Sequence, residues 1–207
     1  MKDPLEEATL ALARGDLVIF PTDTVYGLAA RPDDPAAIRK LFLAKRRPDD
    51  RAIPILASSS DVHRVAIFGE PAERLAAAWP GPITLVLLRT EESAHWDLGG
   101  DVATVAVRIP RHPLALALLA RTGPLAVTSA NLSGRPPLED ADSLAGAFGD
   151  DVAVYLCQDA PLSGLASTVV DATAQAPHIL RAGAVPEADI ARLLAGEGPL
   201  LDSRPSP

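Results

Sequence analysis

The chain contains little cysteine and few aromatic side chains. Its 207 residues include one cysteine, Cys157, and aromatic residues make up 4%. One cysteine cannot form an intramolecular disulfide or a zinc site of several cysteines, and its position in the apolar run VAVYLC predicts a buried, inert thiol. The small number of aromatic residues argues against a surface on which nucleic-acid bases stack.

Common motifs for phosphate binding and hydrolysis are absent as well. The sequence has no P-loop, no GxGxxG after a strand, no HExxH and no GxSxG, and its four histidines lack the spacing of metal ligands. Any reaction must therefore depend on other groups. The N-terminus lacks a signal-peptide pattern, and no apolar run approaches the roughly 20 residues needed to cross a bilayer, so we expect a cytoplasmic protein without membrane association.

The charge of the chain is unevenly distributed. Hydrophobic residues make up 48% and charged residues 22%, as in folded globular domains, and the net charge is -8. This acidic balance argues against a general nucleic-acid coat. Residues 39–51 nevertheless hold six basic and two acidic residues, whereas residues 136–180 hold seven acidic and no basic ones. The chain therefore combines one local basic cluster with a longer acidic stretch.

Short apolar runs rich in β-branched residues alternate with segments of helical spacing, which predicts an α/β sheet with mixed connections. Asp34 and Pro35 are a typical N-cap and first residue of a helix, and Gly15 is a typical helix end. We expect one domain over residues 1–195, followed by a flexible tail at 196–207. The expected strands are 17–20, 53–57, 83–88, 102–109, 125–128, 152–156 and 167–171, and the expected helices are 5–14, 34–47, 71–79, 112–122, 140–148 and 186–196.

Five segments carry polar side chains that could form a site. PTDTVYG (21–27) follows a strand, so its hydroxyls could line a pocket, or the segment could be an ordinary tight turn. The cluster at 45–47 could bind a polyanion, or it could simply place cations at a helix C-terminus.

The third segment, residues 104–110, is also open to two interpretations. Alternation along a strand places Thr104 and Arg108 on one face. Arg108 could bind a carboxylate or phosphate with its planar fork, or face solvent at an edge. The last two segments are TSANLSGR (128–135), and STVVD (167–171) followed by HILR (178–181).

Together and in this order, these segments resemble the YrdC-like family of L-threonylcarbamoyladenylate synthases, which supply the activated intermediate for threonylcarbamoyladenosine in tRNA. The resemblance covers roughly residues 5 to 195 and includes a family signature at Lys45, Arg47, Ser129 and Asn131. It implies a twisted, open, mixed α/β sheet with flanking helices and a concave cleft, of the short single-domain type.

The resemblance also implies a reaction and the residues that carry it. The reaction is an adenylyl transfer in which L-threonine, bicarbonate or CO2 and ATP give threonylcarbamoyl-AMP and pyrophosphate, with magnesium on the phosphates and no metal held by the protein. The product would pass to the tRNA threonylcarbamoyl transferase complex. The implied threonine-binding residues are Thr24, Arg108, Ser129 and Ser167, and the implied ATP-binding residues are Lys45, Arg47, Thr104, Asn131 and Arg181, of which Lys45 and Arg47 are the expected catalytic pair.

The chain departs from longer relatives at two implied nucleotide contacts, and two other functions stay open. Arg51 stands where those relatives have Asn, and Glu139 where they have Thr. One alternative function is an RNA-binding or ribosome-maturation module that uses the same cleft, with weak RNA binding and no catalysis. The other is a carbamoyl-adenylate domain like that of hydrogenase maturation factors, which the absence of their fused segments disfavours.

Overall fold

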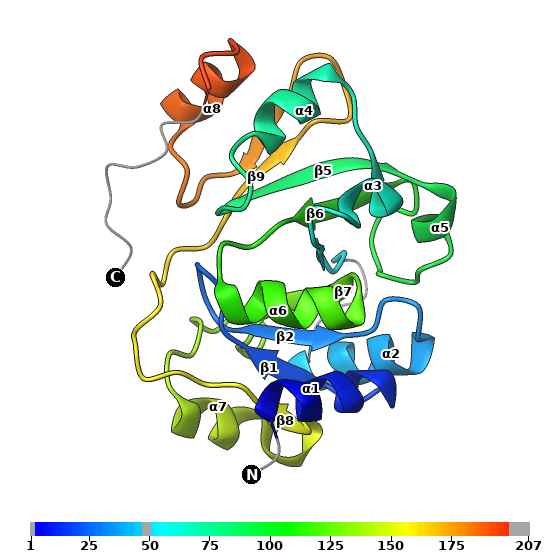
Figure 1. Cartoon of the computed structure of the whole chain (residues 1–207), viewed down its shortest axis with the longest axis vertical. Helices are drawn as coiled ribbons and strands as arrows, with labels where there is room; N and C mark the ends of the chain where they lie inside the picture. The colour runs from blue at the N-terminus through cyan, green and yellow to red at the C-terminus, as the bar shows by residue number, and fades with distance from the viewer. Residues whose placement is uncertain (1–2, 47–50, 199–207) are drawn as a thin grey trace.

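The computed structural model describes residues 3–46 and 51–198. One mixed sheet runs through this part of the chain, in the order β10-β9-β5-β6-β3-β7-β2-β1-β8, with β4 paired to β5 (Figure 1). The strands are β1 Val18–Phe20, β2 Gly27–Ala30, β3 Ile55–Leu56, β4 Ala66–Ile67, β5 Ile83–Arg89, β6 Thr104–Arg108, β7 Leu125–Ser129, β8 Val154–Tyr155, β9 Thr168–Asp171 and β10 His178–Arg181. The pairs β1–β8, β3–β6 and β5–β9 are parallel and the others are antiparallel, and β10 and β8 do not pair, so the sheet is open.

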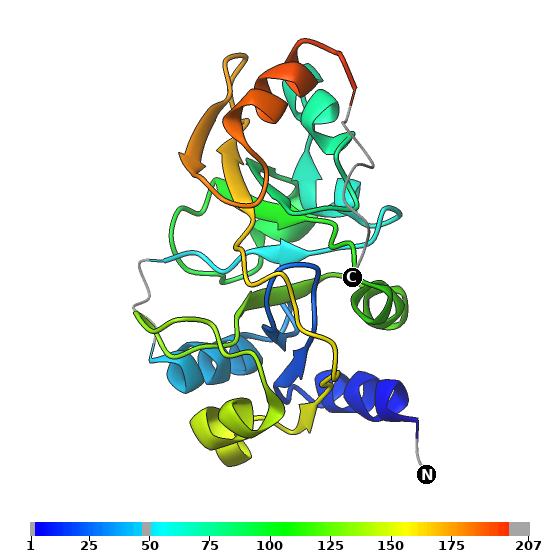
Figure 2. The ribbon, with the colours of Figure 1, turned by 90° about the vertical axis from the view of Figure 1, so that its left-hand side faces the viewer.

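Helices flank the sheet and bury two apolar clusters against it. In Figure 2, α1 and α6 lie on one side of the lower strands, and α2 and α7 lie on the other. The first cluster holds side chains of α1 and α6, and the second holds side chains of α2, α3, α4, α7 and α8. The helices are α1 Pro4–Ala13, α2 Pro35–Lys45, α3 Val62–Val65, α4 Glu70–Ala76, α5 Glu91–Ala94, α6 Pro113–Thr122, α7 Ala141–Phe148 and α8 Glu187–Leu194.

Local sequence signals explain where α1 and α2 begin and end. The Asp34 carboxylate accepts hydrogen bonds from the backbone N–H groups of Ala36 and Ala37 at the start of α2. Gly15, after α1, has φ +77°, and a Cβ at this position would lie 2.4 Å from Asp34 Oδ2. Glycine is therefore required both by the backbone conformation and by the space. The helix α2 ends at Lys45, and its C-cap Arg46 takes the left-handed conformation with φ 51°.

The structure confirms most of the expected elements and corrects several. The expected strands 53–57 and 152–156 are two residues long, and β2, β4 and β10 were not predicted as strands. In β2, glycine and alanine have low strand propensity, but its place between β1 and β7 makes it a strand. Cys157 is exposed, and the prediction of a buried thiol was wrong because β8 ends two residues earlier. Of the predicted tail, only residues 196–198 lie within the described ranges.

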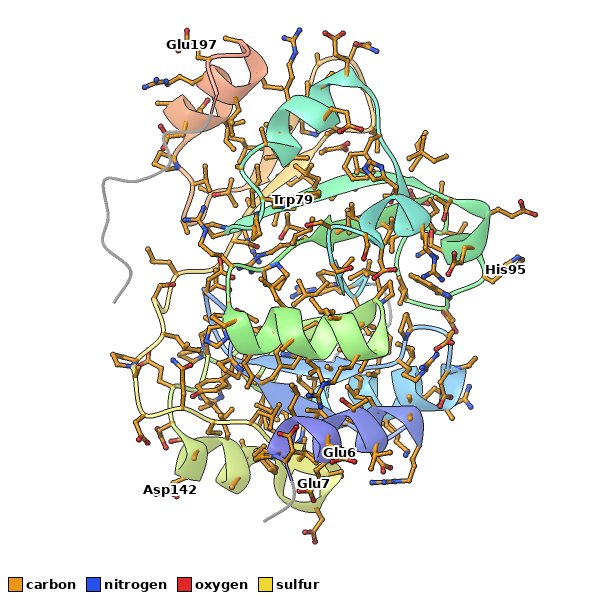
Figure 3. The ribbon with its side chains drawn as sticks, in the orientation of Figure 1. Glu6, Glu7, Trp79, His95, Asp142 and Glu197 are labelled. Atoms are coloured by element: carbon orange, nitrogen blue, oxygen red, sulfur yellow. The ribbon has the colours of Figure 1, made fainter. Side chains whose placement is uncertain are left out.

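The surface of the protein carries acidic side chains that point away from the sheet. Figure 3 labels Glu6 and Glu7 on α1, Asp142 on α7 and Glu197 after α8, all at the outside of the molecule. Among the helices within the described residues, none combines the length and apolar character needed to cross a membrane.

A buried arginine connects β5 to the segment that follows it. Arg89, at the end of β5, is 9% exposed, and its guanidinium donates hydrogen bonds to the carbonyl oxygens of Thr104 (2.8 Å), Ser93 (3.1 Å) and Trp96 (2.8 Å). Burial lowers the pKa of this guanidinium, against the attraction of Asp101 and Asp97.

We predict that Arg89→Met lowers the free energy of unfolding by about 2–3 kcal/mol, because three carbonyl groups lose their donor. Urea denaturation followed by circular dichroism measures this loss. The matched control is Arg64→Met, which removes exposed ion pairs to Asp61 and Glu92 and should cost less than about 1 kcal/mol. Equal losses in the two variants would contradict the structural role of Arg89.

Candidate active site

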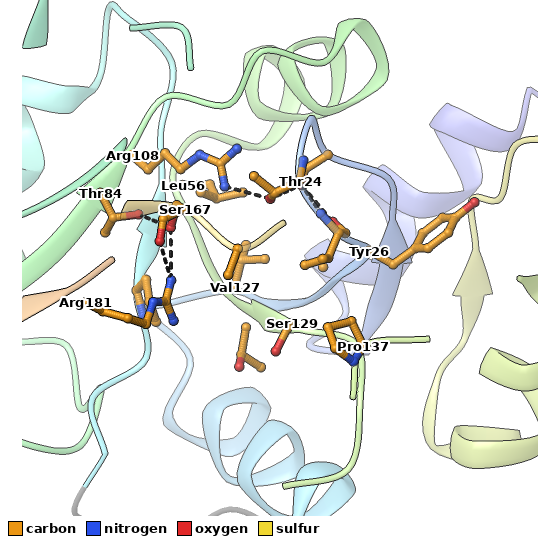
Figure 4. A pocket seen from close by; sticks show the side chains of 16 residues that line it. Thr24, Tyr26, Leu56, Thr84, Arg108, Val127, Ser129, Pro137, Ser167 and Arg181 are labelled. Carbon is orange, nitrogen blue, oxygen red and sulfur yellow. Dashed lines mark hydrogen bonds between the residues drawn. The ribbon is translucent and has the colours of Figure 1, made fainter. Parts of the chain in front are cut away.

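A cavity of about 220 Å³ opens at the middle of the sheet (Figure 4). Its wall is formed by residues of β2, β3, β5, β6, β7 and β10, the loop from Thr22 to Tyr26, and the residues that precede β9. Strands β2, β3, β5, β6 and β7 and the segments at their ends therefore surround this cavity, and β10 reaches it from the edge of the sheet. Among the described residues, no acidic side chain lines this cavity, whereas the guanidinium groups of Arg108 and Arg181 do.

The loop between β1 and β2 is held by the hydroxyl of Thr22. This oxygen accepts hydrogen bonds from the backbone N–H groups of Thr24 (3.2 Å) and Val25 (3.3 Å), and its proton is donated to the carbonyl of Val25 (2.7 Å). Such side-chain turns are typical of threonine. The resulting turn directs the Thr24 side chain into the cavity, where its Oγ1 lies 2.9 Å from Thr22 Oγ1.

Arg108, at the end of β6, connects this loop to the sheet. It is 5% exposed, and its Nε donates to the carbonyl of Gly81 (2.9 Å) while one terminal nitrogen donates to Thr24 Oγ1 (2.9 Å). The other terminal nitrogen forms an ion pair with Asp23, whose carboxylate also accepts from the backbone N–H of Arg111. N–H donors remain on both terminal nitrogens for a ligand. Arg108 is therefore a buried cavity residue, not a solvent-facing arginine at an edge.

The charge of Arg108 is set by opposing effects. Burial lowers the pKa of its guanidinium, Asp23 acts in the opposite direction, and the nearby charge of Arg181 lowers the pKa further. Because the ordinary pKa of arginine lies far above neutrality, the group stays a cation. The cavity therefore presents fixed positive charge to a ligand.

A second hydroxyl cluster lies across the cavity, on the side of β5, β9 and β10. Thr84 Oγ1 and Ser167 Oγ are 2.8 Å apart, and Arg181 donates to the carbonyl (2.7 Å) and the hydroxyl (3.2 Å) of Ser167. The backbone presses closely here, since a Cβ at Gly183 would lie 2.4 Å from the carbonyl carbon of Ser167. Arg181 is exposed at the rim, whereas Thr84 and Ser167 are buried.

The segment between β8 and β9 crosses over the loop between β1 and β2 (Figure 2). Ser163 Oγ donates to the carbonyl of Asp23 (3.0 Å), and the N–H of Gly164 donates to the carbonyl of Thr24 (3.0 Å). The hydroxyl of Tyr26 also exchanges hydrogen bonds with the backbone of Gln158. These contacts fix the loop from both sides.

Lys45 and Asn131 lie behind the cavity wall. Lys45 is 2% exposed, and its Nζ donates to the carbonyl oxygens of Ser129 (2.6 Å) and Asn131 (2.7 Å) and to Asn131 Oδ1 (3.2 Å). Asn131 is 8% exposed and donates through Nδ2 to the carbonyls of Leu132 and Arg135. Both side chains hold the loop that carries Ser129 at the cavity.

The structure brings together the residues that were expected on the threonine side. Thr24, Arg108, Ser129 and Ser167 line the one cavity, and Arg181 joins them from the ATP-binding set. Thr104 does not line it, and its hydroxyl donates to Asp101 (3.2 Å) at the other end of β6. Arg47 lies outside the described residues. The binding roles of all these residues stay predictions.

Sequence reasoning did not single out three residues of the site. Thr84 lies in the cavity wall, Thr22 supports Thr24, and Asp23 pairs with Arg108. Thr22 and Asp23 lie in the segment PTDTVYG (21–27) and Thr84 lies in the strand expected at 83–88, but spacing alone could not distinguish them from ordinary turn and strand residues.

Comparison with known proteins agrees with this geometry. Residues 10–183 match the Sua5/YciO/YrdC family model, described as "Telomere recombination". A relative from Mycobacterium tuberculosis (strain ATCC 25618 / H37Rv), named "Putative threonylcarbamoyl-AMP synthase", is 41% identical over 187 residues, which cover 89% of this chain and 86% of that protein. The threonylcarbamoyl-AMP synthase of Pyrococcus abyssi is 37% identical over 203 residues, which cover 94% of this chain and 59% of that longer protein.

Solved structures show the same likeness. The crystal structure of P. abyssi Sua5 complexed with L-threonine matches with a TM-score of 0.82 and 36% identity, over 94% of this chain and 58% of that one. Escherichia coli YciO matches with a TM-score of 0.79 and 23% identity, over 88% and 90%, which is a likeness in fold. Since the family model spans most of the chain and curated relatives share about two fifths of its residues, this chain belongs to the Sua5/YciO/YrdC family.

Proposed function

We propose that this chain is a threonylcarbamoyl-AMP synthase, which converts L-threonine, bicarbonate or CO2 and ATP to threonylcarbamoyl-AMP and pyrophosphate for threonylcarbamoyladenosine formation in tRNA. The observation that carries this proposal is the cavity in which the hydroxyls of Thr24, Ser129 and Ser167 meet the guanidinium groups of Arg108 and Arg181. Relatives of the chain carry the same activity in their names, and the related P. abyssi structure contains L-threonine.

The proposed chemistry needs no protein nucleophile. The amino group of threonine combines with CO2, or with bicarbonate with loss of water, to form an N-carboxylate. An oxygen of this carboxylate then attacks the α-phosphorus of ATP, and the bond to the departing pyrophosphate breaks. The protein has to align the two reactants and stabilise the charge that develops on the leaving group. Such an adenylyl transfer would make the enzyme a nucleotidyltransferase.

Each wall of the cavity suits one part of this task. The free N–H groups of Arg108 are suited to the threonine carboxylate, because a guanidinium binds both carboxylate oxygens. Arg181 is exposed at the rim, which suits contact with phosphate, and the family resemblance implies ATP binding for Arg47 as well. On the nucleotide side, the roles of Lys45, Thr104 and Asn131 are carried by the family resemblance alone.

Magnesium and partners belong to the same proposal. Within the described ranges, no group of three or more His, Cys, Asp or Glu side chains is placed to hold a metal ion. Magnesium would enter with the phosphates of the ATP substrate. The product would pass to a tRNA threonylcarbamoyl transferase in the cytoplasm.

We predict that the purified protein releases pyrophosphate only when threonine, bicarbonate and ATP are all present. A coupled pyrophosphate assay, with each substrate omitted in turn, measures this dependence. Equal release without threonine would contradict the synthase. Release that depends on carbamoyl phosphate in place of threonine would indicate the carbamoyl-adenylate reaction instead. Absence of turnover together with strongly salt-dependent binding of tRNA or duplex RNA would favour the RNA-binding alternative.

We predict that Arg181→Gln lowers kcat/KM for ATP by about 10- to 100-fold, because a charge-assisted hydrogen bond is worth about 1.5–3 kcal/mol. The control Arg121→Gln changes an exposed arginine paired with Asp3 and should leave kcat/KM within about twofold of the wild type. Thermal melts of both variants report whether the fold is kept. An unchanged kcat/KM for ATP in Arg181→Gln would remove Arg181 from the site.

A further inference from the structure

The hydrogen bonds behind Ser129 determine which way its hydroxyl proton points. Asn131 Nδ2 lies 2.9 Å from the carbonyl oxygen of Leu132 and 2.6 Å from that of Arg135, and both oxygens can only accept. The amide orientation is therefore fixed, and Oδ1 faces Lys45 and Ser129. The hydroxyl of Ser129 donates its single proton to this oxygen. What Ser129 presents to the cavity is therefore lone pairs only.

Thr24 is less constrained than Ser129. Its Oγ1 accepts from Arg108 and lies 2.9 Å from Thr22 Oγ1, and either hydroxyl of that pair can donate. Ser129 therefore offers only acceptors at the end of β7, whereas Arg108, Arg181 and the Thr84–Ser167 pair offer donors elsewhere in the cavity wall.

Lys45 is the origin of this arrangement at Ser129. Its ammonium group binds the carbonyls of Ser129 and Asn131 and shares Asn131 Oδ1 with the Ser129 hydroxyl. The backbone carbonyl of Lys45 also accepts from the N–H of Ser133, so the end of α2 and the loop are joined by side-chain and main-chain contacts. The ammonium group of Lys45 is 2% exposed, and it donates its N–H groups to these three acceptors within the protein.

We propose that Lys45 is a positioning residue for the amino-acid substrate: acting through Asn131, it holds Ser129 as a hydrogen-bond acceptor, so that the substrate amino group faces Ser129 on β7 while its carboxylate faces Arg108. This inference rests on the proposed function, and it differs from the expectation that Lys45 binds ATP. Lys45 therefore contributes to recognition of the amino acid indirectly, through Asn131 and Ser129, and other cations bind the phosphates.

A double-mutant cycle on binding of L-threonine tests this role. Calorimetry without ATP should show about tenfold weaker binding for Lys45→Met and for Ser129→Ala, and the double variant should be no weaker than the worse single variant by more than about twofold. The matched control is Lys40→Met on the same helix. The ammonium group of Lys40 is half exposed and binds Gly15 and Asp16, so this variant should bind L-threonine as the wild type does.

Two results would overturn the proposal. Losses that multiply in the double variant would mean that Lys45 acts independently of Ser129. An unchanged affinity for L-threonine in Lys45→Met, with a raised KM for ATP, would make Lys45 a phosphate ligand. If Lys45→Met fails to fold in a thermal melt, Asn131→Ala replaces it in the same cycle with Ser129→Ala. Losses that multiply in that double variant, or an unchanged affinity for L-threonine in Asn131→Ala, would then overturn the positioning through Asn131.

Hydrogen exchange separates this inference from the proposed function. In the ligand-free protein, the amides of residues 129–135 should exchange at least about tenfold faster in Lys45→Met than in Lys40→Met, because the loop loses the donor that holds its carbonyls. If the wild type does not bind L-threonine but exchange changes as predicted, L-threonine is not the substrate, and Lys45 still positions the loop. Unchanged exchange would overturn the positioning role itself.

Discussion

The buried pair of Arg108 and Asp23 joins parts of the chain that are far apart in the sequence. Arg108 ends β6, Asp23 lies in the loop between β1 and β2, and Gly81 precedes β5, and one guanidinium joins these three segments. Removing one partner of such a pair leaves an uncompensated buried charge, which costs about 3–5 kcal/mol. The position of the loop between β1 and β2 against the end of β6 therefore depends on this contact.

The same contact prepares the site for a ligand. The guanidinium is held on one edge by the carbonyl of Gly81 and on the other by Thr24 and Asp23, so its orientation is fixed before any substrate arrives. Ordering a long side chain in advance removes part of the entropy that binding would otherwise cost. Because the charged side chains that the described part of the chain contributes to the cavity wall are Arg108 and Arg181, the wall suits an anionic ligand.

The hydroxyl groups of the cavity determine the orientation in which a ligand can bind. A serine or threonine hydroxyl can donate or accept, and only its surroundings decide which. At Ser129 the proton is already used within the protein, whereas the Thr84–Ser167 pair, with Arg181 donating to Ser167, keeps one proton for a ligand. A zwitterionic amino acid can satisfy both walls in one orientation, and the reversed orientation would place its carboxylate against acceptors.

The sequence by itself determined the local features of this protein and indicated some of the residues that line its cavity. Asp34 and Gly15 predict helix ends because capping and positive φ are local properties, and the ordered motifs indicate Thr24, Arg108, Ser129, Ser167 and Arg181. Only the tertiary structure decided that Arg108 is buried, that β2 is a strand, that Cys157 is exposed and that Lys45 faces a loop. Burial and hydrogen-bond partners depend on segments that are distant in sequence, and no local pattern contains that information.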